Sequence, residues 1–218
     1  MIKIAPSILA ADPINLERDV IRAASAGCDW LHIDVMDAHF VPNLAYSPAV
    51  VRRLKTAVQI PLDVHLMMDH PETLLESFLD AGADILTIHA EADADVPALL
   101  ERIRARGALA GIAVKPGTPL SAIIPVIHRA DLVLTMTVEP GFGGQTLDAS
   151  VLDKIHQLRQ IGYRGEIEAD GGIREDNLEM LISRGLSVAV MGTALFSLTD
   201  MESAIARMHG FLAGEDQV

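Results

Sequence analysis

The feature that most constrains the fold is a repeated unit: a short apolar strand, a loop, an amphipathic helix and then a glycine. Segments with strand character recur at intervals of about 22 to 33 residues, roughly the length that a βα unit needs. They begin near Lys3, Leu31, Leu62, Asp84, Ala110, Leu132, Glu166 and Val188. Strands that alternate with helices eight times predict a parallel sheet closed into a (β/α)8 TIM barrel, an α/β fold. An open doubly wound sheet remains the alternative.

The helices between the strands carry their own start and stop signals. Asp12 and Pro13 predict an N-cap and a first-turn proline for the first helix, which ends at Gly27. Its buried face is predicted to consist of Leu16, Val20, Ile21 and Ala24. Pro125 interrupts the helix that would follow the fifth strand, so that helix is predicted to be short.

Composition limits the partners and the compartment. We expect a single domain over residues 1–218, with a frayed polar tail at about 214–218, because no linker or low-complexity segment divides the chain. The formal charge of −13 and the lack of a basic cluster argue against nucleic acid, and no apolar run is long enough for a membrane span. The single cysteine, Cys28, is expected in the core of a reduced protein. The first residues lack a charged leader, so we expect a cytoplasmic protein.

In a barrel of this kind, functional groups lie at the carboxyl ends of the strands. Alternate residues of a strand share a face, so His32 and Asp34 point one way from the second strand and His65 points the same way from the third. With Asp170, at the end of the seventh strand, they make a candidate metal site. Two imidazoles and two carboxylates suit Zn²⁺, Fe²⁺, Co²⁺ or Mn²⁺.

Three glycine-rich turns follow the last three strands, at Gly141 to Gly144, at Gly171–Gly172 and at Gly192–Thr193. Glycine lets the backbone approach a ligand and expose its N–H groups, and a short helix from Thr193 would point its N-terminus at the same place. These turns predict a phosphate site. The candidate substrate-binding residues are Ser7, His65, Gly141, Phe142, Gly143, Gly144, Asp170, Gly171, Gly172, Gly192 and Thr193. Met36, Met67 and Met136 fall at equivalent strand ends, where they either fill the core or form an apolar wall beside the metal.

The motifs at these positions resemble those of the ribulose-phosphate 3-epimerase family over almost the whole chain. They are SILAAD at Ser7, HIDVMDAHFVPN at His32, LDVHLM at His65, VEPGFGGQ at Glu139, EADGGI at Asp170 and MGTALF at Gly192. The resemblance implies an isomerase of the pentose phosphate pathway that interconverts ribulose 5-phosphate and xylulose 5-phosphate with one divalent metal ion. It also implies that Asp34 and Asp170 are the acid/base pair, that His32 and His65 complete the metal site, and that the protein is a homodimer or homohexamer.

This implied chemistry agrees with the residues. Epimerisation at C3 removes a proton beside the C2 carbonyl and returns one from the opposite face, which two carboxylates on either side of a planar enediolate can do. Two positions depart from the family pattern. Ala38 stands where the family has glycine, and a positive φ there would strain the loop by about 1 kcal/mol. The NLAYSP segment at 43–48 resembles hexulose 6-phosphate epimerases, which leaves the substrate's length open.

Three other readings compete with a pentulose-phosphate epimerase. A 3-epimerase of allulose 6-phosphate would use the same chemistry on a longer sugar. A decarboxylase of a related barrel class would carry Asp-x-Lys-x-x-Asp on the third strand, but the run from Asp63 to Met67 has no lysine. A non-catalytic sugar-phosphate-binding barrel would bind the same ligand without exchanging its C3 proton.

Overall fold

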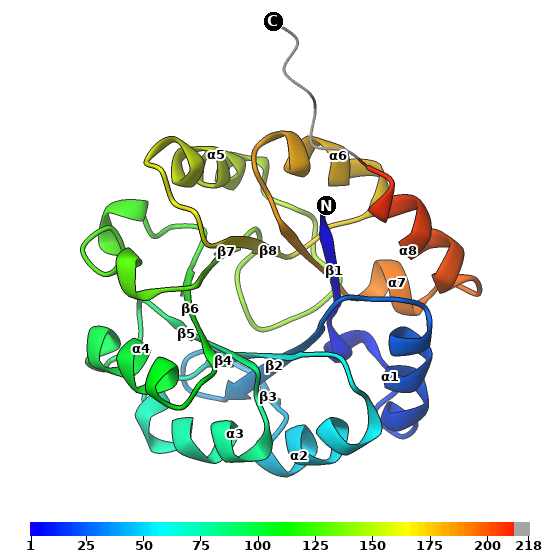
Figure 1. Ribbon diagram of the computed structural model, residues 1–218, viewed down its shortest axis with the longest axis horizontal. Helices are drawn as coiled ribbons and strands as arrows, with labels where there is room; N and C mark the ends of the chain where they lie inside the picture. Colours follow the sequence, from blue (N-terminus) through cyan, green and yellow to red (C-terminus); the bar gives the residue numbers. More distant parts are fainter. Residues whose placement is uncertain (212–218) are drawn as a thin grey trace, which may run out of the picture.

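The computed structural model describes residues 1–211, which form a ring of parallel strands surrounded by helices (Figure 1). The parallel strands are β1 (Lys3–Pro6), β2 (Leu31–Asp37), β4 (Leu62–Met67), β5 (Ile85–His89), β6 (Leu109–Val114), β7 (Leu132–Met136), β8 (Glu166–Asp170) and β9 (Val188–Met191). They pair in the order β1-β9-β8-β7-β6-β5-β4-β2. A parallel bridge between Ser7 and His32 joins the two ends of this sheet. The predicted closed barrel is confirmed, and the open sheet is wrong.

Most helices cover the outside of the ring. They are α1 (Leu16–Ser25), α2 (Pro48–Ala57), α3 (Leu75–Ala81), α4 (Val96–Ala105), α5 (Leu152–Gln160), α6 (Glu175–Ser183), α7 (Thr193–Phe196) and α8 (Met201–His209). The segment between β6 and β7 contains only two 3-10 turns, Leu120–Ala122 and Ile127–Arg129, on either side of Pro125. Proline lacks the N–H that a continuous helix would use, so the predicted shortening is confirmed. The predicted tail at 214–218 lies outside the described residues.

The predicted start of α1 is wrong. The helix begins at Leu16, because the Asp12 carboxylate accepts hydrogen bonds from the Ile14 N–H at 3.0 Å and the Asn15 side chain at 2.7 Å, which forms a turn before the helix. Ile21, predicted to be buried, is 43% exposed, whereas Val20 is fully buried. Neighbouring residues on a helix point about 100° apart, so Ile21 turns toward solvent while Val20 faces the core.

The loop after β2 folds back as a short strand that the sequence did not predict. This strand, β3 (Leu44–Ala45), pairs antiparallel with the end of β2, and Met36 lies opposite Ala45. At the turn, Ala38 has a φ of 62°, so the backbone is left-handed where a residue with a side chain is disfavoured. The condition under which Ala38 strains this loop is therefore met.

The barrel has two separate packing layers. Outward-facing strand residues such as Ile33, Val64 and Ile112 pack against the helices, and Cys28 is buried in the same layer as predicted. Trp30, Leu134 and Val188 belong to a second apolar cluster inside the ring. Toward the carboxyl ends of the strands, inward-facing polar residues such as His32, Asp34 and His65 form the site described next.

Candidate active site

The structure brings the four predicted metal ligands together. One nitrogen each from His32 and His65 and one oxygen each from Asp34 and Asp170 all lie within 4.8 Å of one another. The β2–β4 register sets Asp34 beside His65, and β8 ends at Asp170. Both imidazoles are fully buried and Asp34 is almost so. The order of the strands therefore converts residues far apart in the chain into one compact set of donors.

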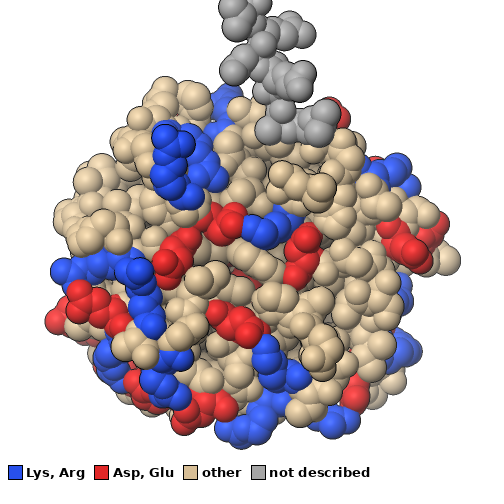
Figure 2. Space-filling model, viewed as in Figure 1, with Lys and Arg blue, Asp and Glu red and all other residues tan. Residues whose placement is uncertain are grey.

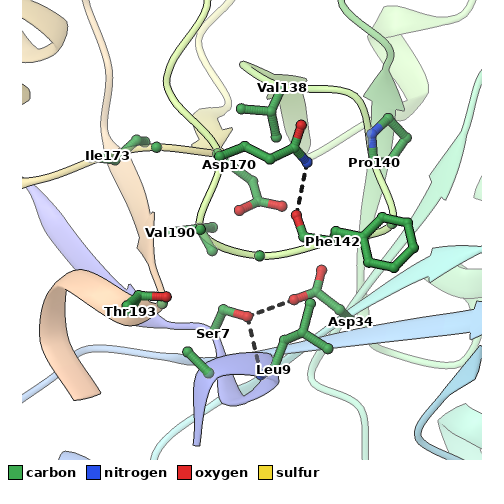
Figure 3. Close-up of a pocket in the computed structure, with 18 of the residues that line it drawn as sticks. Ser7, Leu9, Asp34, Val138, Pro140, Phe142, Asp170, Ile173, Val190 and Thr193 are labelled. Carbon is green, nitrogen blue, oxygen red and sulfur yellow. Dashed lines mark hydrogen bonds between the residues drawn. The ribbon is translucent and has the colours of Figure 1, made fainter. Parts of the chain in front are cut away.

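Asp34 is held at the centre of this set. The Ser7 hydroxyl donates a hydrogen bond of 2.6 Å to Asp34 Oδ2, as Figure 3 shows. The other oxygen, Asp34 Oδ1, lies 3.3 Å from both His32 Nε2 and His65 Nδ1, which is long for a hydrogen bond to a carboxylate. Within residues 1–211, His32 Nε2 has no hydrogen-bond partner although it is buried. An unpartnered imidazole nitrogen beside carboxylate oxygens fits a metal ion.

A second polar layer lies beneath the first, and sequence reasoning did not assign it. His32 Nδ1 lies 2.6 Å from Asp63 Oδ2 and 3.6 Å from Glu168 Oε1, and all three side chains are fully buried. A proton on Nδ1 that is donated to Asp63 leaves the Nε2 lone pair free to face the upper layer. Asp63 is two residues before His65, and Glu168 is two before Asp170. The two-residue alternation that singled out the ligands could therefore have found both carboxylates.

The electrostatics of the site favour a positive group at its centre. Burial lowers the pKa of His32, but the carboxylates of Asp34 and Asp63 outweigh burial and raise that pKa well above its usual value. Burial raises the pKa of Asp34, but the neighbouring His32 outweighs burial and holds that pKa far below its ordinary value. The same carboxylates that would retain a proton on His32 would attract a divalent cation.

The two aspartates have opposite ionisation tendencies. Burial, together with the negative charge of Asp34, raises the pKa of Asp170 to about 7. Burial and the negative charge of Asp63 likewise raise the pKa of Glu168 well above its usual value. Without a metal ion, the surroundings therefore favour the carboxylate form of Asp34 and the protonated form of Asp170. A pair of carboxyl groups whose pKa values are pushed apart can divide the roles of base and acid.

His65 is also the first member of a chain of hydrogen-bonding groups that extends beyond the donor set. Its Nε2 lies 2.9 Å from Nε2 of His89, and Nδ1 of His89 lies 2.9 Å from Glu91 Oε2. Burial lowers the pKa of His89 to about 4. Burial raises the pKa of Glu91, but its hydrogen bonds, from His89 first, outweigh burial and lower that pKa to about 2. His89 therefore joins the donor set through its contact with His65.

The donor set opens into a cavity of about 290 Å³, into which Asp34 and Asp170 both point (Figure 3). Every predicted substrate-binding residue except His65 lines this cavity, and so do Met36, Met67 and Met136. Gly171 and Gly172 have φ values of 122° and 66°, and a side chain on Gly172 would come within 2.3 Å of the Leu147 nitrogen. The turn after β8 therefore requires glycine for its backbone geometry as well as for access to a ligand.

Some cavity residues were missed by the sequence reasoning. Gln145 shapes the loop after β7, because its amide nitrogen donates 2.8 Å hydrogen bonds to the carbonyl oxygens of Glu139 and Phe142. Arg174 also lines the cavity, beside Gly171 and Gly172, and among the described lining residues it is the only cation. The remaining unpredicted lining residues are Leu9, Ala10, Val138, Pro140, Ile173, Val190, Ala194 and Ser197. A basic residue two positions after the second glycine turn was the signal that could have identified Arg174.

Two features outside the cavity concern membranes and nucleic acid, against which the sequence argues. In the part of the chain that the structure describes, no helix is long and apolar enough to cross a membrane. On the face drawn in Figure 2, acidic and basic side chains are interspersed without a continuous basic surface.

Comparison with known proteins gives consistent results. The model of the ribulose-phosphate 3 epimerase family matches residues 3–196. A ribulose-phosphate 3-epimerase of Bacillus subtilis is 40% identical over 215 residues, which cover 96% of this chain and 99% of that protein. A chloroplastic ribulose-5-phosphate-3-epimerase of Arabidopsis thaliana is 43% identical, over 93% of this chain and 74% of that protein. Among solved structures, a 3-keto-L-gulonate-6-phosphate decarboxylase of Vibrio cholerae superposes with a TM-score of 0.73 at 18% identity, covering 97% of this chain and 98% of that one. That similarity concerns the fold alone.

Proposed function

The chain belongs to the ribulose-phosphate 3-epimerase family, and we propose that it acts as a single-domain isomerase that interconverts D-ribulose 5-phosphate and D-xylulose 5-phosphate. The observation that carries this proposal is the placement of Asp34 and Asp170 in one cavity with their pKa values displaced in opposite directions. Moving a proton from one face of C3 to the other needs one ionised and one protonated carboxyl group.

In the proposed mechanism, the two aspartates exchange protons with C3 from opposite sides. The ionised Asp34 takes the C3 proton, and Asp170 returns a proton to the other face; in the reverse reaction the roles are exchanged. The Ser7 hydroxyl fixes Asp34 Oδ2, so the carboxylate is oriented before substrate arrives. The wall of Met36, Met67 and Met136, each no more than 2% exposed, excludes water from the reacting carbon.

His32, Asp34, His65 and Asp170 would hold the divalent metal ion, of which Zn²⁺, Fe²⁺, Co²⁺ and Mn²⁺ all suit this donor set. A bound ion of this kind supplies Lewis-acid stabilisation of the negative charge that develops on the substrate oxygens. The Asp63 carboxylate keeps His32 oriented with Nε2 toward that position.

The glycine turns would hold the phosphate group. Gly143 has an ordinary φ, and a side chain built on it would touch nothing within 4 Å, so packing in the described chain does not require glycine there. An open backbone N–H for a phosphate oxygen explains that glycine better than the fold does. Anchoring the phosphate at this end of the cavity sets C3 between the two aspartates.

Incubation with ribulose 5-phosphate in D2O tests the function. The expected result is xylulose 5-phosphate carrying deuterium at C3. Recovery of unlabelled ribulose 5-phosphate, with Zn²⁺, Fe²⁺, Co²⁺ and Mn²⁺ each supplied in turn, would contradict the proposal and favour the non-catalytic sugar-phosphate-binding barrel.

The substrate's length is tested by comparing kcat/KM for ribulose 5-phosphate and allulose 6-phosphate. The segment that suggested a hexulose ends at Ser47 and Pro48, which begin α2 and are not among the described residues that line the cavity. We therefore expect the pentulose phosphate to be preferred. Assembly into a homodimer or homohexamer and a cytoplasmic location are part of the same proposal. Analytical ultracentrifugation and imaging of the tagged chain test them.

A further inference from the structure

In the chain of hydrogen-bonding groups from His65 through His89 to Glu91, each hydrogen bond has a defined donor and acceptor. We propose that His89 and Glu91 are positioning residues that fix the tautomer of His65, so that its Nδ1 lone pair, and not an N–H, faces the metal site. This inference rests on the proposed function, in which His65 holds a metal ion.

The geometry leaves little freedom for these groups. His65 and His89 are fully buried, and their nearest ring nitrogens, both Nε2, lie 2.9 Å apart. On the far side of His89, Nδ1 lies 2.9 Å from Glu91 Oε2. The second oxygen of this carboxylate, Oε1, accepts a 2.8 Å hydrogen bond from the Lys115 backbone N–H. Each oxygen of Glu91 therefore faces a hydrogen-bond donor or a nitrogen able to donate.

These contacts determine where the protons lie. A neutral imidazole carries one N–H and one lone pair, and a carboxylate only accepts. His89 must therefore donate from Nδ1 to Glu91, which leaves a lone pair on His89 Nε2. The proton between the two rings must then belong to His65 Nε2. His65 Nδ1 is left with a lone pair, and this is the atom that lies 3.3 Å from Asp34 Oδ1.

The surroundings hold the chain of groups in place. The Lys154 ammonium binds the carbonyl oxygens of Lys115, Pro116 and Thr118 at 2.6 to 2.9 Å, which fixes the loop that supplies the N–H to Glu91. The Phe40 ring packs on His89 with a centroid separation of 4.6 Å. The orientation of His65 is therefore set by groups on β5, on the loops after β2 and β6, and on α5.

Replacing Glu91 by glutamine gives a specific test, because the two side chains have almost the same shape. The glutamine amide has only one oxygen that accepts hydrogen bonds, whereas His89 Nδ1 and the Lys115 backbone N–H each have a carboxylate oxygen of Glu91 as partner. The Lys115 backbone N–H can only donate, but His89 can change tautomer. The amide oxygen should therefore turn to Lys115 and the amide nitrogen to His89 Nδ1. His89 would then donate from Nε2, and His65 would carry its proton on Nδ1, where it blocks the metal.

Two further variants separate this effect from general damage. In His89→Gln, the amide oxygen can accept from His65 Nε2 and the amide nitrogen can donate to Glu91, so the direction of the hydrogen bonds is kept. In Glu72→Gln, the change is made at an exposed His–Glu pair with the same spacing, where His70 Nδ1 lies 3.5 Å from Glu72 Oε1. Both side chains of that pair are exposed, and neither belongs to the donor set, so the pair serves as the matched control.

The measurements are the Zn²⁺ dissociation constant, by competition with a chromophoric chelator after metal removal, and the ¹⁵N spectrum of labelled histidine in the metal-free protein. Glu91→Gln should weaken Zn²⁺ binding about 10- to 100-fold and move the His65 proton from Nε2 to Nδ1. His89→Gln and Glu72→Gln should bind Zn²⁺ as the wild type does.

Wild-type affinity in Glu91→Gln, or an unchanged His65 tautomer in its ¹⁵N spectrum, would overturn the inference. Equal weakening in His89→Gln and Glu91→Gln would do the same, because it would show that only packing matters. A wild-type chain that binds no Zn²⁺ would contradict the proposed metal site, and the ¹⁵N spectra would still decide the tautomer.

Discussion

Ala38→Gly should make the protein more stable, although glycine usually has the opposite effect. Ala38 has a φ of 62°, at the turn that carries the chain from β2 to β3. Its N–H donates to the Asn43 carbonyl oxygen at 2.9 Å, so the tight turn holds this conformation. The backbone contact does not depend on the side chain, and the Ala38 methyl group is exposed, so glycine would remove little buried apolar surface.

The magnitude follows from two opposing contributions. A left-handed conformation costs a residue with a Cβ about 1–2 kcal/mol, and glycine removes this cost. Glycine also gives the unfolded chain more conformational freedom, which costs about 0.4–1 kcal/mol. The net gain in the free energy of unfolding should be about 0.5–1 kcal/mol. For a chain of this length that gain corresponds to a rise in Tm of about 1–4 °C.

Urea unfolding followed by circular dichroism measures this difference, with the slope of the transition checked for equality between variants. The matched control is Ala206→Gly, at an exposed position inside α8, where the same substitution should cost about 0.5–1 kcal/mol. If both variants lose stability by similar amounts, the backbone at Ala38 is not strained and the reasoning fails.

Three further predictions concern the site itself. Asp170→Asn should keep the far-ultraviolet circular dichroism spectrum but lower kcat by about 10²- to 10⁴-fold in a coupled assay of xylulose 5-phosphate; near-wild-type turnover would remove Asp170 from the mechanism. In metal-free protein, Asp170, whose pKa burial raises from 3.8 to about 7, keeps its proton in the folded chain and loses it in the unfolded one, so its stabilising effect is present near pH 4 and disappears as the pH rises through about 7. Between about pH 4 and pH 7 in urea unfolding, the wild type should lose about 1–3 kcal/mol of unfolding free energy relative to Asp170→Asn, below the full ~4 kcal/mol because Asp170 is partly exposed; taking this difference cancels the opposite pH dependence of His89, whose pKa burial lowers to about 4. Arg174→Gln should raise KM for ribulose 5-phosphate about tenfold at low salt and less at high salt, whereas Arg184→Gln, which breaks an exposed ion pair with Asp153, should leave KM unchanged.

The barrel and the upper layer of the site could be predicted from the sequence because both depend on residue patterns that repeat at short intervals along the chain. A strand alternates its faces every two residues, so His32, Asp34 and Met36 could be assigned to one face from their spacing alone. The parallel register then brings them beside Asp63, His65 and Met67, with no further information needed. Ser7 could be assigned to the same site because it directly follows the end of β1, where its hydroxyl contacts Asp34.

Features that depend on side-chain competition or on distant loops were not predictable in this way. The start of α1 is decided by whether Asp12 caps a helix or closes a turn, and its sequence permits both. Strand β3 exists because the loop after β2 folds back to pair with Met36 and Asp37, and a strand of two residues is too short to show an alternating pattern. The two-residue spacing of His89 and Glu91 is visible in the sequence. The role of Glu91, however, depends on the Lys115 N–H, which a different loop contributes.

The β2–β4 register also has a role in specifying the fold. His32 lies opposite Asp63, and one layer higher Asp34 lies opposite His65, so each imidazole faces a carboxylate on the neighbouring strand. A slip of one residue would turn these buried polar groups toward the helices, and a slip of two would place Asp34 beside Asp63 without an imidazole between them. Both alternatives leave charges buried without partners, which costs several kcal/mol. The residues proposed to hold the metal therefore also fix the register of the strands that present them, so substitutions at Asp63 should lower folding stability as well as metal affinity.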